Sequence, residues 1–433
     1  MHFALIAPPL AGHMNPMLAL GGELIARGHQ ATYFGVADTR DRVVRAGVAF
    51  VAMGAGSHPA GELEQRSRML ARAGSLSALR GVIDMMARDT KMLVAGLPQA
   101  LHDARVDGLI VDQLEPAGGL VARHLGLPYA SLASALMINR DVIAPPYFTG
   151  WQPKDTSTAR QMIKGAEQVY DWLTRTHGNV IAAAAHDWRL GDLKTCQDCL
   201  SPDLDLIQIP AAYDVPRLAP APQLAFVGPI RAAGDADDQT LPNAKPGDGR
   251  PLVFASFGTL FGGRYQSFLA IAEGARRAGC RVAIAHGGRL TSDEVRHLEA
   301  SGADVADFVP QRALLQSAAA CVSHGGMNTT MDALEAGVPL LAMAIGFDQM
   351  ANAARIEHHG CGMALTHRKA TPDRVARALD ALINTVGYAA RAKSMSAAIK
   401  ACGGRREAAN RVVELVEAAT QPRVQSGAPA ASP

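Results

Sequence analysis

The stretch SHGGMNTTMDALEAGVP, residues 323–339, decides the fold prediction. A short apolar run, residues 319–322, leads directly into a serine, His324 and two glycines, and a helical pattern follows with Asn328 and Thr329 at its start. The first turn of a helix has unpaired N–H groups and a partial positive charge, and glycines let a phosphate approach the backbone closely. The sequence therefore predicts a strand, a tight turn and a helix N-terminus suited to a phosphate. A capped helix without a ligand is the alternative for these residues alone.

The rest of the chain repeats this alternation of strands and helices. Strands are expected in the first half at 2–7, 30–34, 49–53, 107–112 and 127–133 and in the second half at 252–258, 280–286, 303–308, 320–324 and 339–345. The first helix is expected from Met17 to Arg27. This order is typical of parallel sheets with right-handed crossovers. We therefore expect an α/β protein with two doubly wound, Rossmann-like domains whose parallel sheets face each other across a cleft, where ligands bind at the carboxyl ends of the strands.

The domain borders are expected from length and composition. The 433 residues are too many for one ordinary core. Residues 231–251 are rich in Gly, Pro, Asp and Ala and lack apolar periodicity, so we interpret them as the linker between an N-terminal domain, 1–230, and a C-terminal domain, 252–403. A last helix is expected over 404–419, and a crossing back of this helix to the N-terminal domain is left open. The tail, 420–433, has the composition of a disordered segment.

Composition excludes several classes of function. A net charge of +2 and 5% aromatic residues argue against a nucleic-acid partner. No apolar run reaches the length of a membrane span, and the N-terminal residues lack the basic region of a signal peptide. The six scattered cysteines favour a reduced, cytoplasmic protein. Cys196 and Cys199 form a single C-x-x-C, which is weak evidence for zinc, so no metal site is predicted.

Three further turns of the second half carry groups suited to a nucleotide joined through a diphosphate to a sugar. They provide small donors, an aromatic ring with an amide, and a carboxylate with an amide: Gly258 and Thr259, Phe308 and Gln311, and Asp348 and Gln349. The ring can stack on a base, and the last pair can bind sugar hydroxyls. No Walker lysine motif is present and no G-x-G-x-x-G follows the first strand, which disfavours NTPases and dehydrogenases.

These residues resemble a known family. FVPQ, 308–311, and HGGMNTTMDALEAGVPLLAMAIGFDQ, 324–349, are similar to the donor-binding signature of the inverting UDP-sugar glycosyltransferases of the GT-B fold. The resemblance covers essentially the whole chain, and IAPPLAGHMNPMLALGGELIARGH, 6–29, resembles the acceptor motif. Two segments closely resemble one branch, the bacterial zeaxanthin (carotenoid) glucosyltransferases: VDQLEPAGGLVARHLGLPYASLASALMINRD, 111–141, and YDWLTRTHGNVI, 170–181. VFASFGTLFGGRY, 253–265, and SHGGMNTTMDAL, 323–334, fit the same branch.

The resemblance implies roles for the matching residues. His13 matches the catalytic base and Asp112 its orienting partner. Asp332 stands where the wider family has a ribose-binding glutamate, and Phe308 stands where the base-stacking residue is often tryptophan. The implied donor-binding residues are Gly258, Thr259, Phe308, Gln311, His324, Gly326, Asn328, Thr329, Asp332, Asp348 and Gln349.

These roles make a coherent chemistry. A histidine can take the proton of an acceptor hydroxyl at neutral pH while the new bond forms, and a carboxylate can stabilise the imidazolium. Attack opposite the leaving diphosphate inverts the anomeric centre. For the acceptor, the helical region 62–97 and the loop 134–150 are candidate walls, although 62–97 also fits an ordinary amphipathic helix pair. Asn139 and Arg140 are interpreted as either acceptor-binding or structural residues.

The predicted function is transfer of a hexose, glucose by preference, from a UDP-sugar to a hydroxyl of a lipophilic small molecule. The resembled branch implies zeaxanthin or a similar hydroxylated carotenoid. The alternative is a glycosyltransferase of another natural product or lipid with a different sugar. A non-enzymatic GT-B-like helper protein is disfavoured because the base and the donor motif are both present. No cofactor or metal is expected beside the UDP-sugar, and a lipophilic acceptor is compatible with peripheral membrane contact.

Overall fold

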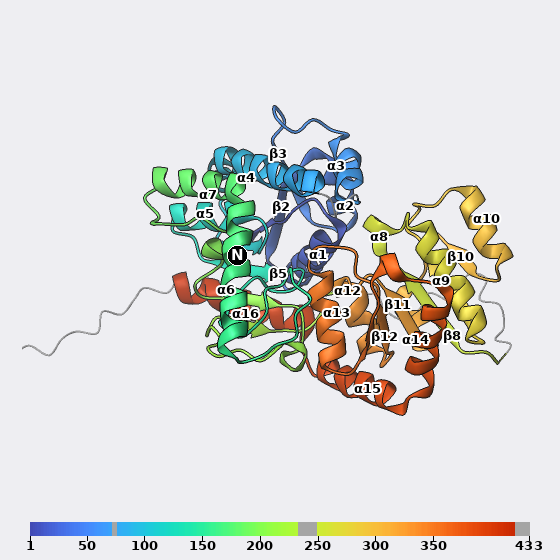
Figure 1. Cartoon of the computed structure of the whole chain (residues 1–433). Helices are drawn as coiled ribbons and strands as arrows, with labels where there is room; N and C mark the ends of the chain where they lie inside the picture. The colour runs from blue at the N-terminus through green and yellow to red at the C-terminus, as the bar shows by residue number, and fades with distance from the viewer. Residues whose placement is uncertain (72–75, 233–248, 421–433) are drawn as a thin grey trace, which may run out of the picture.

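The computed structural model describes residues 1–71, 76–232 and 249–420. Within them the chain forms two sheets, shown in Figure 1, one of seven strands and one of six. The first sheet contains β1 (His2–Ile6), β2 (Gln30–Val36), β3 (Ala49–Met53), β4 (Gly108–Asp112), β5 (Tyr129–Ala133), β6 (Asp205–Ile207) and β7 (Leu224–Phe226). The second contains β8 (Leu252–Ser256), β9 (Arg281–Ala285), β10 (Asp304–Ala306), β11 (Ala318–Ser323), β12 (Leu340–Ala342) and β13 (Gly362–Ala364).

The helices alternate with these strands. They are α1 (Ala11–Ala26), α2 (Arg40–Arg45), α3 (Glu62–Ala71), α4 (Leu76–Ala104), α5 (Pro116–Leu125), α6 (Ser157–Leu173), α7 (Arg175–Asp187), α8 (Gly258–Phe261), α9 (Tyr265–Arg277), α10 (Ser292–Ala300), α11 (Gln311–Gln316), α12 (Met327–Glu335), α13 (Gln349–His358), α14 (Pro372–Asn384), α15 (Val386–Lys400) and α16 (Gly404–Thr420). Four short 3-10 helices lie at Ala37–Thr39, Gln197–Cys199, Ala211–Tyr213 and His367–Lys369.

The strand orders confirm the predicted fold class. The first sheet runs β3-β2-β1-β4-β5-β6-β7 and the second β10-β9-β8-β11-β12-β13. All the strand pairs are parallel. Each order therefore reverses once, between β1 and β4 and between β8 and β11, as in doubly wound Rossmann-like folds.

Continuous apolar strands explain why helices cover both faces of each sheet. All five residues of β4, β5 and β8 are buried, which is the pattern of a parallel strand inside a two-sided sandwich. In the first sheet, α1 and α16 share one apolar core, and α4 and α5 share the other. The strands β7 and β13 were not expected from the sequence because three residues are too few to show a periodic pattern.

The predicted start of the first helix is wrong. The sequence placed it at Met17, whereas α1 begins at Ala11 and continues through Pro16. Proline has no N–H, so the helix lacks the bond that residue 16 would make to the Gly12 carbonyl, but the surrounding turns persist. As a result, His13 lies in the first turn of a helix and not in a preceding loop.

The two halves pack against each other through apolar and polar contacts. One core cluster combines Leu136, Met137 and Tyr213 from the first half with residues of α12, α13 and α15. The backbone N–H of Leu136 donates to Asp348 Oδ2 at 3.3 Å. α16 packs on α1, and Arg405 of α16 is ion-paired with Glu23 of α1 at 2.9 Å. The last helix of the described residues therefore lies against the half in which the chain begins.

The close packing of α5 gives a stability prediction. A Cβ on Gly119 would lie 2.1 Å from the Cys199 carbonyl oxygen, whereas a Cβ on Gly22 of α1 has no atom within 4 Å. We expect Gly119→Ala to lower the free energy of unfolding by about 1–3 kcal/mol through overpacking. Gly22→Ala, the control, should raise it by up to about 1 kcal/mol because alanine favours the helix. Denaturant melts of both variants test this, and equal midpoints would contradict it.

Candidate active site

The reversal points of the two sheets bring the predicted residues together. β1 leads into α1, which carries His13, and β4 ends at Asp112. In the second sheet, β8 leads to Gly258 and β11 leads to His324. Figure 1 shows α1 of the first half and α8 and α12 of the second near the line where the two halves meet. Ligands of doubly wound sheets bind at such points.

His13 and Asp112 form a hydrogen-bonded pair. His13 Nδ1 lies 2.8 Å from Asp112 Oδ2, and the Asp112 side chain is fully buried. The other carboxylate oxygen accepts from the backbone N–H of Leu114 at 2.9 Å, which fixes the carboxylate. An ionised carboxylate only accepts hydrogen bonds, so Nδ1 carries the proton and Nε2 of the neutral ring is left as an acceptor. This arrangement prepares Nε2 to take a proton.

The electrostatics of the pair make His13 a stronger base than an ordinary histidine. Burial alone would lower the pKa of His13, but the carboxylate of Asp112 outweighs it, with a smaller contribution from Asp348, and the pKa is raised. Burial in turn raises the pKa of the Asp348 carboxyl, against the opposing Leu136 N–H and His13. Asp348 therefore lies close enough to His13 across the boundary for each to affect the other.

Asp348 and Gln349 form the start of α13. Gln349 Oε1 accepts from the backbone N–H groups of Ile345 and Gly346 at 2.9 and 3.0 Å, so this side chain fixes the turn after β12. Phe347, immediately before them, has a left-handed backbone with φ of 56° and an exposed ring. Left-handed aromatic residues are uncommon and tend to mark functional turns. The turn presents the Asp348 carboxylate toward the first half.

His324 lies just before the start of α12, where the sequence predicts a phosphate-type site. His324 Nδ1 is buried and has no hydrogen-bond partner among the described residues. Burial lowers the pKa of His324 to about 4, against a smaller opposing effect of the Ser256 backbone, so the ring is neutral at pH 7. A neutral imidazole has a single N–H, and the tautomer with the proton on Nδ1 can donate it to a ligand. A Cβ on Gly326 would lie 2.5 Å from His324 Nε2, so glycine is needed beside the ring.

The first turn of α12 follows directly. It begins at Met327, contains Asn328 and Thr329, and carries no acidic side chain that would neutralise its positive end. Asn328 is exposed, whereas Thr329 is buried with its hydroxyl 3.4 Å from Gln311 Oε1. Gly258 opens α8 next to the His324 ring, and Thr259 follows it. The N–H groups of these turns are the expected anion donors.

Phe308 and Asp332 lie on either side of Gln311 in different environments. Phe308, in the loop after β10, is 69% exposed, which leaves its face available for stacking. Asp332 is instead engaged on both oxygens. Gln311 Nε2 donates to Oδ2 at 2.7 Å, and Arg231 is ion-paired with Oδ1. The hydroxyls of a ribose bound at Asp332 would therefore have to share the carboxylate with these partners or replace one of them.

Arg231 contacts a predicted site residue, and the sequence did not indicate this contact. It lies in the segment interpreted as a linker and is ion-paired with Asp332 and with Glu335, the latter at 2.7 Å. Its carbonyl accepts from Arg405 of α16 at 3.1 Å. The surrounding Gly, Pro and Asp residues carry no periodic signal that would distinguish this arginine.

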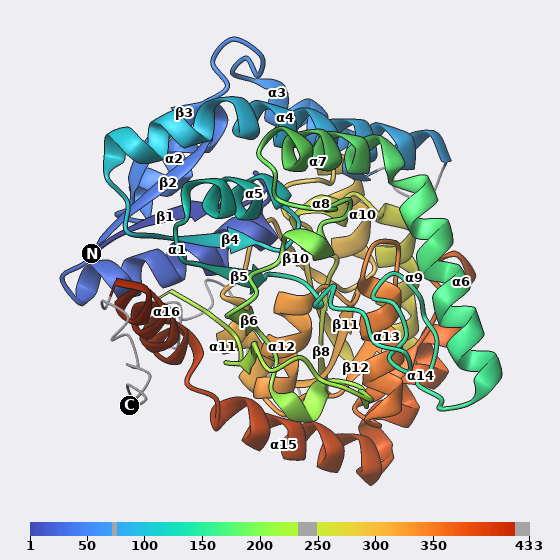
Figure 2. The same ribbon diagram turned by 90° about the vertical axis from the view of Figure 1, so that its left-hand side faces the viewer.

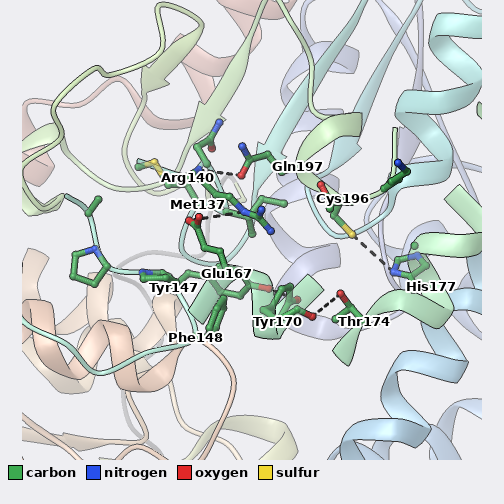
Figure 3. Close-up of a pocket in the computed structure, with 18 of the residues that line it drawn as sticks. Met137, Arg140, Tyr147, Phe148, Glu167, Tyr170, Thr174, His177, Cys196 and Gln197 are labelled. Carbon is green, nitrogen blue, oxygen red and sulfur yellow. Dashed lines mark hydrogen bonds and ion pairs between the residues drawn. The ribbon is translucent and has the colours of Figure 1, made fainter. Parts of the chain in front are cut away.

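A pocket lined mainly by residues of the first half, with Arg355 of α13, includes Met137 and Ile138. These two residues follow Leu136, which contacts Asp348. Figure 3 shows the aromatic end of this pocket, where Tyr147 and Phe148 meet Tyr170 of α6. The rings of Phe148 and Tyr170 are stacked with centroids 4.5 Å apart, and the hydroxyls of Tyr147 and Tyr170 are 2.5 Å apart. Ile83 and Met86 of α4 also line it. The regions 62–97 and 134–150, predicted as acceptor walls, thus both contribute side chains to one pocket, and the helix pair of 62–97 is also present as α3 and α4.

The pocket wall is tied to the catalytic pair through Gln113, the residue after Asp112. Gln113 Nε2 donates to the Leu136 carbonyl at 2.8 Å, and Gln113 Oε1 accepts from the Ile138 N–H at 3.1 Å. Ile138 lines the pocket, and Leu136 also donates to Asp348. One short segment therefore connects the pocket with Asp112 on one side and Asp348 on the other.

Asn139 and Arg140 line the pocket but are held by other side chains. Asn139 Nδ2 donates to Asp205 Oδ2 at 2.8 Å. Arg140 donates through both terminal nitrogens to Asp171 of α6. Both residues therefore have structural contacts, and a contact with the acceptor stays a prediction.

A buried polar chain runs behind the pocket. Thr90 Oγ1 lies 3.3 Å from Glu115 and 2.9 Å from His177 Nε2, and His177 Nδ1 lies 4.0 Å from Cys196 Sγ. Burial, with the nearby Asp89 carboxylate, raises the pKa of Glu115 well above its usual range. Among the described residues no group of three or more His, Cys, Asp or Glu side chains is placed to hold a metal ion.

Comparisons with known proteins agree with this geometry. Residues 280–415 match the family described as erythromycin biosynthesis protein CIII-like, C-terminal domain. The chain is 37% identical over 422 residues to a zeaxanthin glucosyltransferase of Pantoea ananas, covering 97% of each chain. It superimposes on the glycosyltransferase of kitacinnamycin with a TM-score of 0.74 at 21% identity, over 96% of this chain and 98% of that one. It also superimposes on the glycosyltransferase VinC, solved with dTDP, with a TM-score of 0.67 at 19% identity, over 96% and 100% of the two chains.

Proposed function

Because the chain belongs to the zeaxanthin glucosyltransferases, which are glycosyltransferases of the GT-B fold, we propose that it transfers glucose from UDP-glucose to a hydroxyl of zeaxanthin or a similar hydroxylated carotenoid. The observation that carries the proposal is the His13–Asp112 pair. Gln113, the residue after Asp112, bonds the segment 136–138 that borders the pocket, and Leu136 of that segment donates to Asp348 of the second half.

The proposed mechanism uses the residues where the structure brings them together. His13 Nε2 removes the proton of the acceptor hydroxyl, and Asp112 stabilises the imidazolium that forms. The hydroxyl oxygen attacks the anomeric carbon as the bond to the diphosphate breaks. His324 Nδ1 and the first-turn N–H groups of α12 stabilise the negative charge of the leaving diphosphate by hydrogen bonds. Attack from the opposite face inverts the configuration.

The donor is proposed to bind in the C-terminal half, residues 252–403. Phe308 stacks on the base, Gln311 and Asp332 face the ribose, and Asp348 with Gln349 binds sugar hydroxyls. The exposure of Phe308 and the orphaned Nδ1 of His324 support this placement. Binding of the ribose would exchange one Asp332 partner, either Gln311 or Arg231, for a hydroxyl.

The acceptor is proposed to enter the pocket of the N-terminal half, residues 1–230. The cavity is about 50 Å³, well below the roughly 300–1,000 Å³ typical of ligand pockets, so its walls must move apart for a ring to enter. Met86 and Met137 are unbranched side chains that can adapt in this way.

The place of work is proposed to be the cytoplasm, because six free cysteines are compatible with a reducing compartment. A lipophilic acceptor brings the protein to a membrane surface.

A donor and acceptor assay tests the proposal. Purified protein is incubated with UDP- and TDP-sugars and with zeaxanthin in detergent, and products are identified by mass spectrometry. We expect one or two hexosyl units added to zeaxanthin with UDP-glucose, and no product when either partner is left out.

The other outcomes separate the alternatives. Transfer to a different hydroxylated lipid or from another sugar nucleotide would identify a related glycosyltransferase. No product with any acceptor, together with no thermal protection by UDP-glucose, would contradict the enzyme and favour the helper protein. Free epimerised donor would indicate an epimerase.

A further inference from the structure

The outer face of α6 carries an apolar stripe that is open to solvent. Met162, Val169 and Trp172 are 49%, 57% and 59% exposed. Spacings of seven and three residues put the three side chains on one face of the helix. Figure 2 shows α6 at the right-hand edge of the molecule, outside both sheets. Three large apolar side chains aligned on one helix differ from the single exposed residues that are usual on protein surfaces.

The inner face of the same helix forms part of the pocket. Ile163 is buried, and Glu167 and Tyr170 line the cavity. Tyr170 is the residue that stacks on Phe148 at the aromatic end. One helix therefore separates the proposed acceptor pocket from the exposed apolar stripe.

The charges around the stripe are unbalanced toward positive. The nearby carboxylates are each ion-paired with an arginine, Asp155 with Arg160 and both Glu167 and Asp171 with Arg140. Lys154, Lys164 and Arg175 have no ion pair among the described residues. Basic side chains beside an apolar helix face are complementary to anionic lipid headgroups.

Trp172 and Arg175 form a pair suited to a membrane interface. The Arg175 guanidinium carbon lies 4.7 Å from the centroid of the indole ring, and Arg175 Nη1 donates to the Trp172 carbonyl at 2.8 Å. Indole rings prefer the level of lipid headgroups, where one side is apolar and the other polar. A stable protein partner would need roughly 20–30 residues on each side, which a stripe one helix wide does not provide.

We propose that α6 binds the surface of an anionic membrane, with Met162, Val169 and Trp172 at the boundary of headgroups and acyl chains. Within the described residues no helix is long and apolar enough to cross a membrane, so the contact is peripheral. A lipophilic acceptor then passes from the bilayer to the pocket behind the same helix. This passage rests on the proposed function, whereas the binding itself does not.

Vesicle flotation tests the binding. The double variant V169S/W172S is compared with wild type and with a matched control, V44S/V386S, whose residues are 57% and 81% exposed on α2 and α15. On vesicles of phosphatidylcholine with phosphatidylglycerol, we expect the α6 variant to bind roughly tenfold more weakly or worse and the control to bind like wild type. Binding of wild type should weaken with salt and on phosphatidylcholine alone. Equal losses in both double variants, or no binding by wild type, would overturn the proposal.

A transfer assay separates this proposal from the proposed function. With zeaxanthin in detergent, V169S/W172S should work at the wild-type rate, and with zeaxanthin in vesicles it should be roughly tenfold slower. A wild type that binds vesicles but transfers no sugar in either form would contradict the function and leave the surface standing. If the wild type transfers sugar, dimerises through the α6 stripe and does not bind vesicles, the membrane proposal is wrong and the stripe is an interface with a second copy of the chain.

Discussion

The His13→Ala variant is expected to transfer sugar about 10²- to 10⁴-fold more slowly than wild type, because it loses the group that takes the acceptor proton. The donor site is not touched by this change, so UDP should still protect the variant against thermal unfolding. The measurement is the rate of product formation at saturating donor. His358→Ala, an exposed histidine at the end of α13, is the control and should keep the wild-type rate. A His13→Ala variant with full activity would remove His13 from the mechanism.

The pH dependence of kcat/KM identifies the same base. His13 must be neutral to act, and its pKa is raised above the ordinary value of 6.5 by Asp112. Activity should therefore fall as the pH drops through this raised value. In Asp112→Asn the carboxylate is lost and burial dominates, so the acidic limb should move to lower pH while the rate falls roughly tenfold or more. An unchanged limb would mean that another group titrates.

The second large effect is expected at His324. His324→Ala should lower kcat by about 10²- to 10³-fold, because it removes a preorganised donor from the position of the leaving diphosphate. The pKa of about 4 keeps the ring neutral in the assay range, so its contribution is a hydrogen bond and not a full charge. His324→Gln, which keeps an N–H donor, should recover part of the loss.

Two readouts make the His324 prediction specific. Protection by UDP against thermal unfolding should weaken in His324→Ala, whereas it should persist in His13→Ala. If His324→Ala bound UDP like wild type and kept its rate, the phosphate-type site would have to lie elsewhere. Loss of UDP protection in His13→Ala would instead indicate that the first half contributes to donor binding.

The sequence was sufficient for the parts of the fold that depend on strong local patterns. Buried apolar strands such as β4 and β8, each followed by a turn with polar residues, predicted the sheets and the positions of Asp112 and Gly258 at strand ends. The contact between His13 and Asp112, 99 positions apart, follows once β1 and β4 are neighbours. The family resemblance supplied that pairing in advance.

Other features depend on tertiary contacts that leave no local pattern. The start of α1 was misplaced because Pro16 looks like a helix start, whereas the helix tolerates it. Arg231 was hidden in a segment without periodicity, although it contacts Asp332. The aromatic end of the pocket joins residues 147–148 to Tyr170 on α6, and only the folded chain brings these together.

The position of α16 affects how this protein can be recombined with its relatives. Ala409, Val412 and Val416 of α16 belong to the same apolar core as α1, and Arg27, which caps the end of α1, donates to Asn410 at 2.6 Å. A chimera with a single junction in residues 231–251 would therefore combine one parent's α1 with the other parent's α16. With the donor bound in residues 252–403 as proposed, exchange of sugar-nucleotide preference between relatives requires two junctions, the second just before Gly404. The exchanged segment is then internal to the chain, and α1 and α16 come from the same parent.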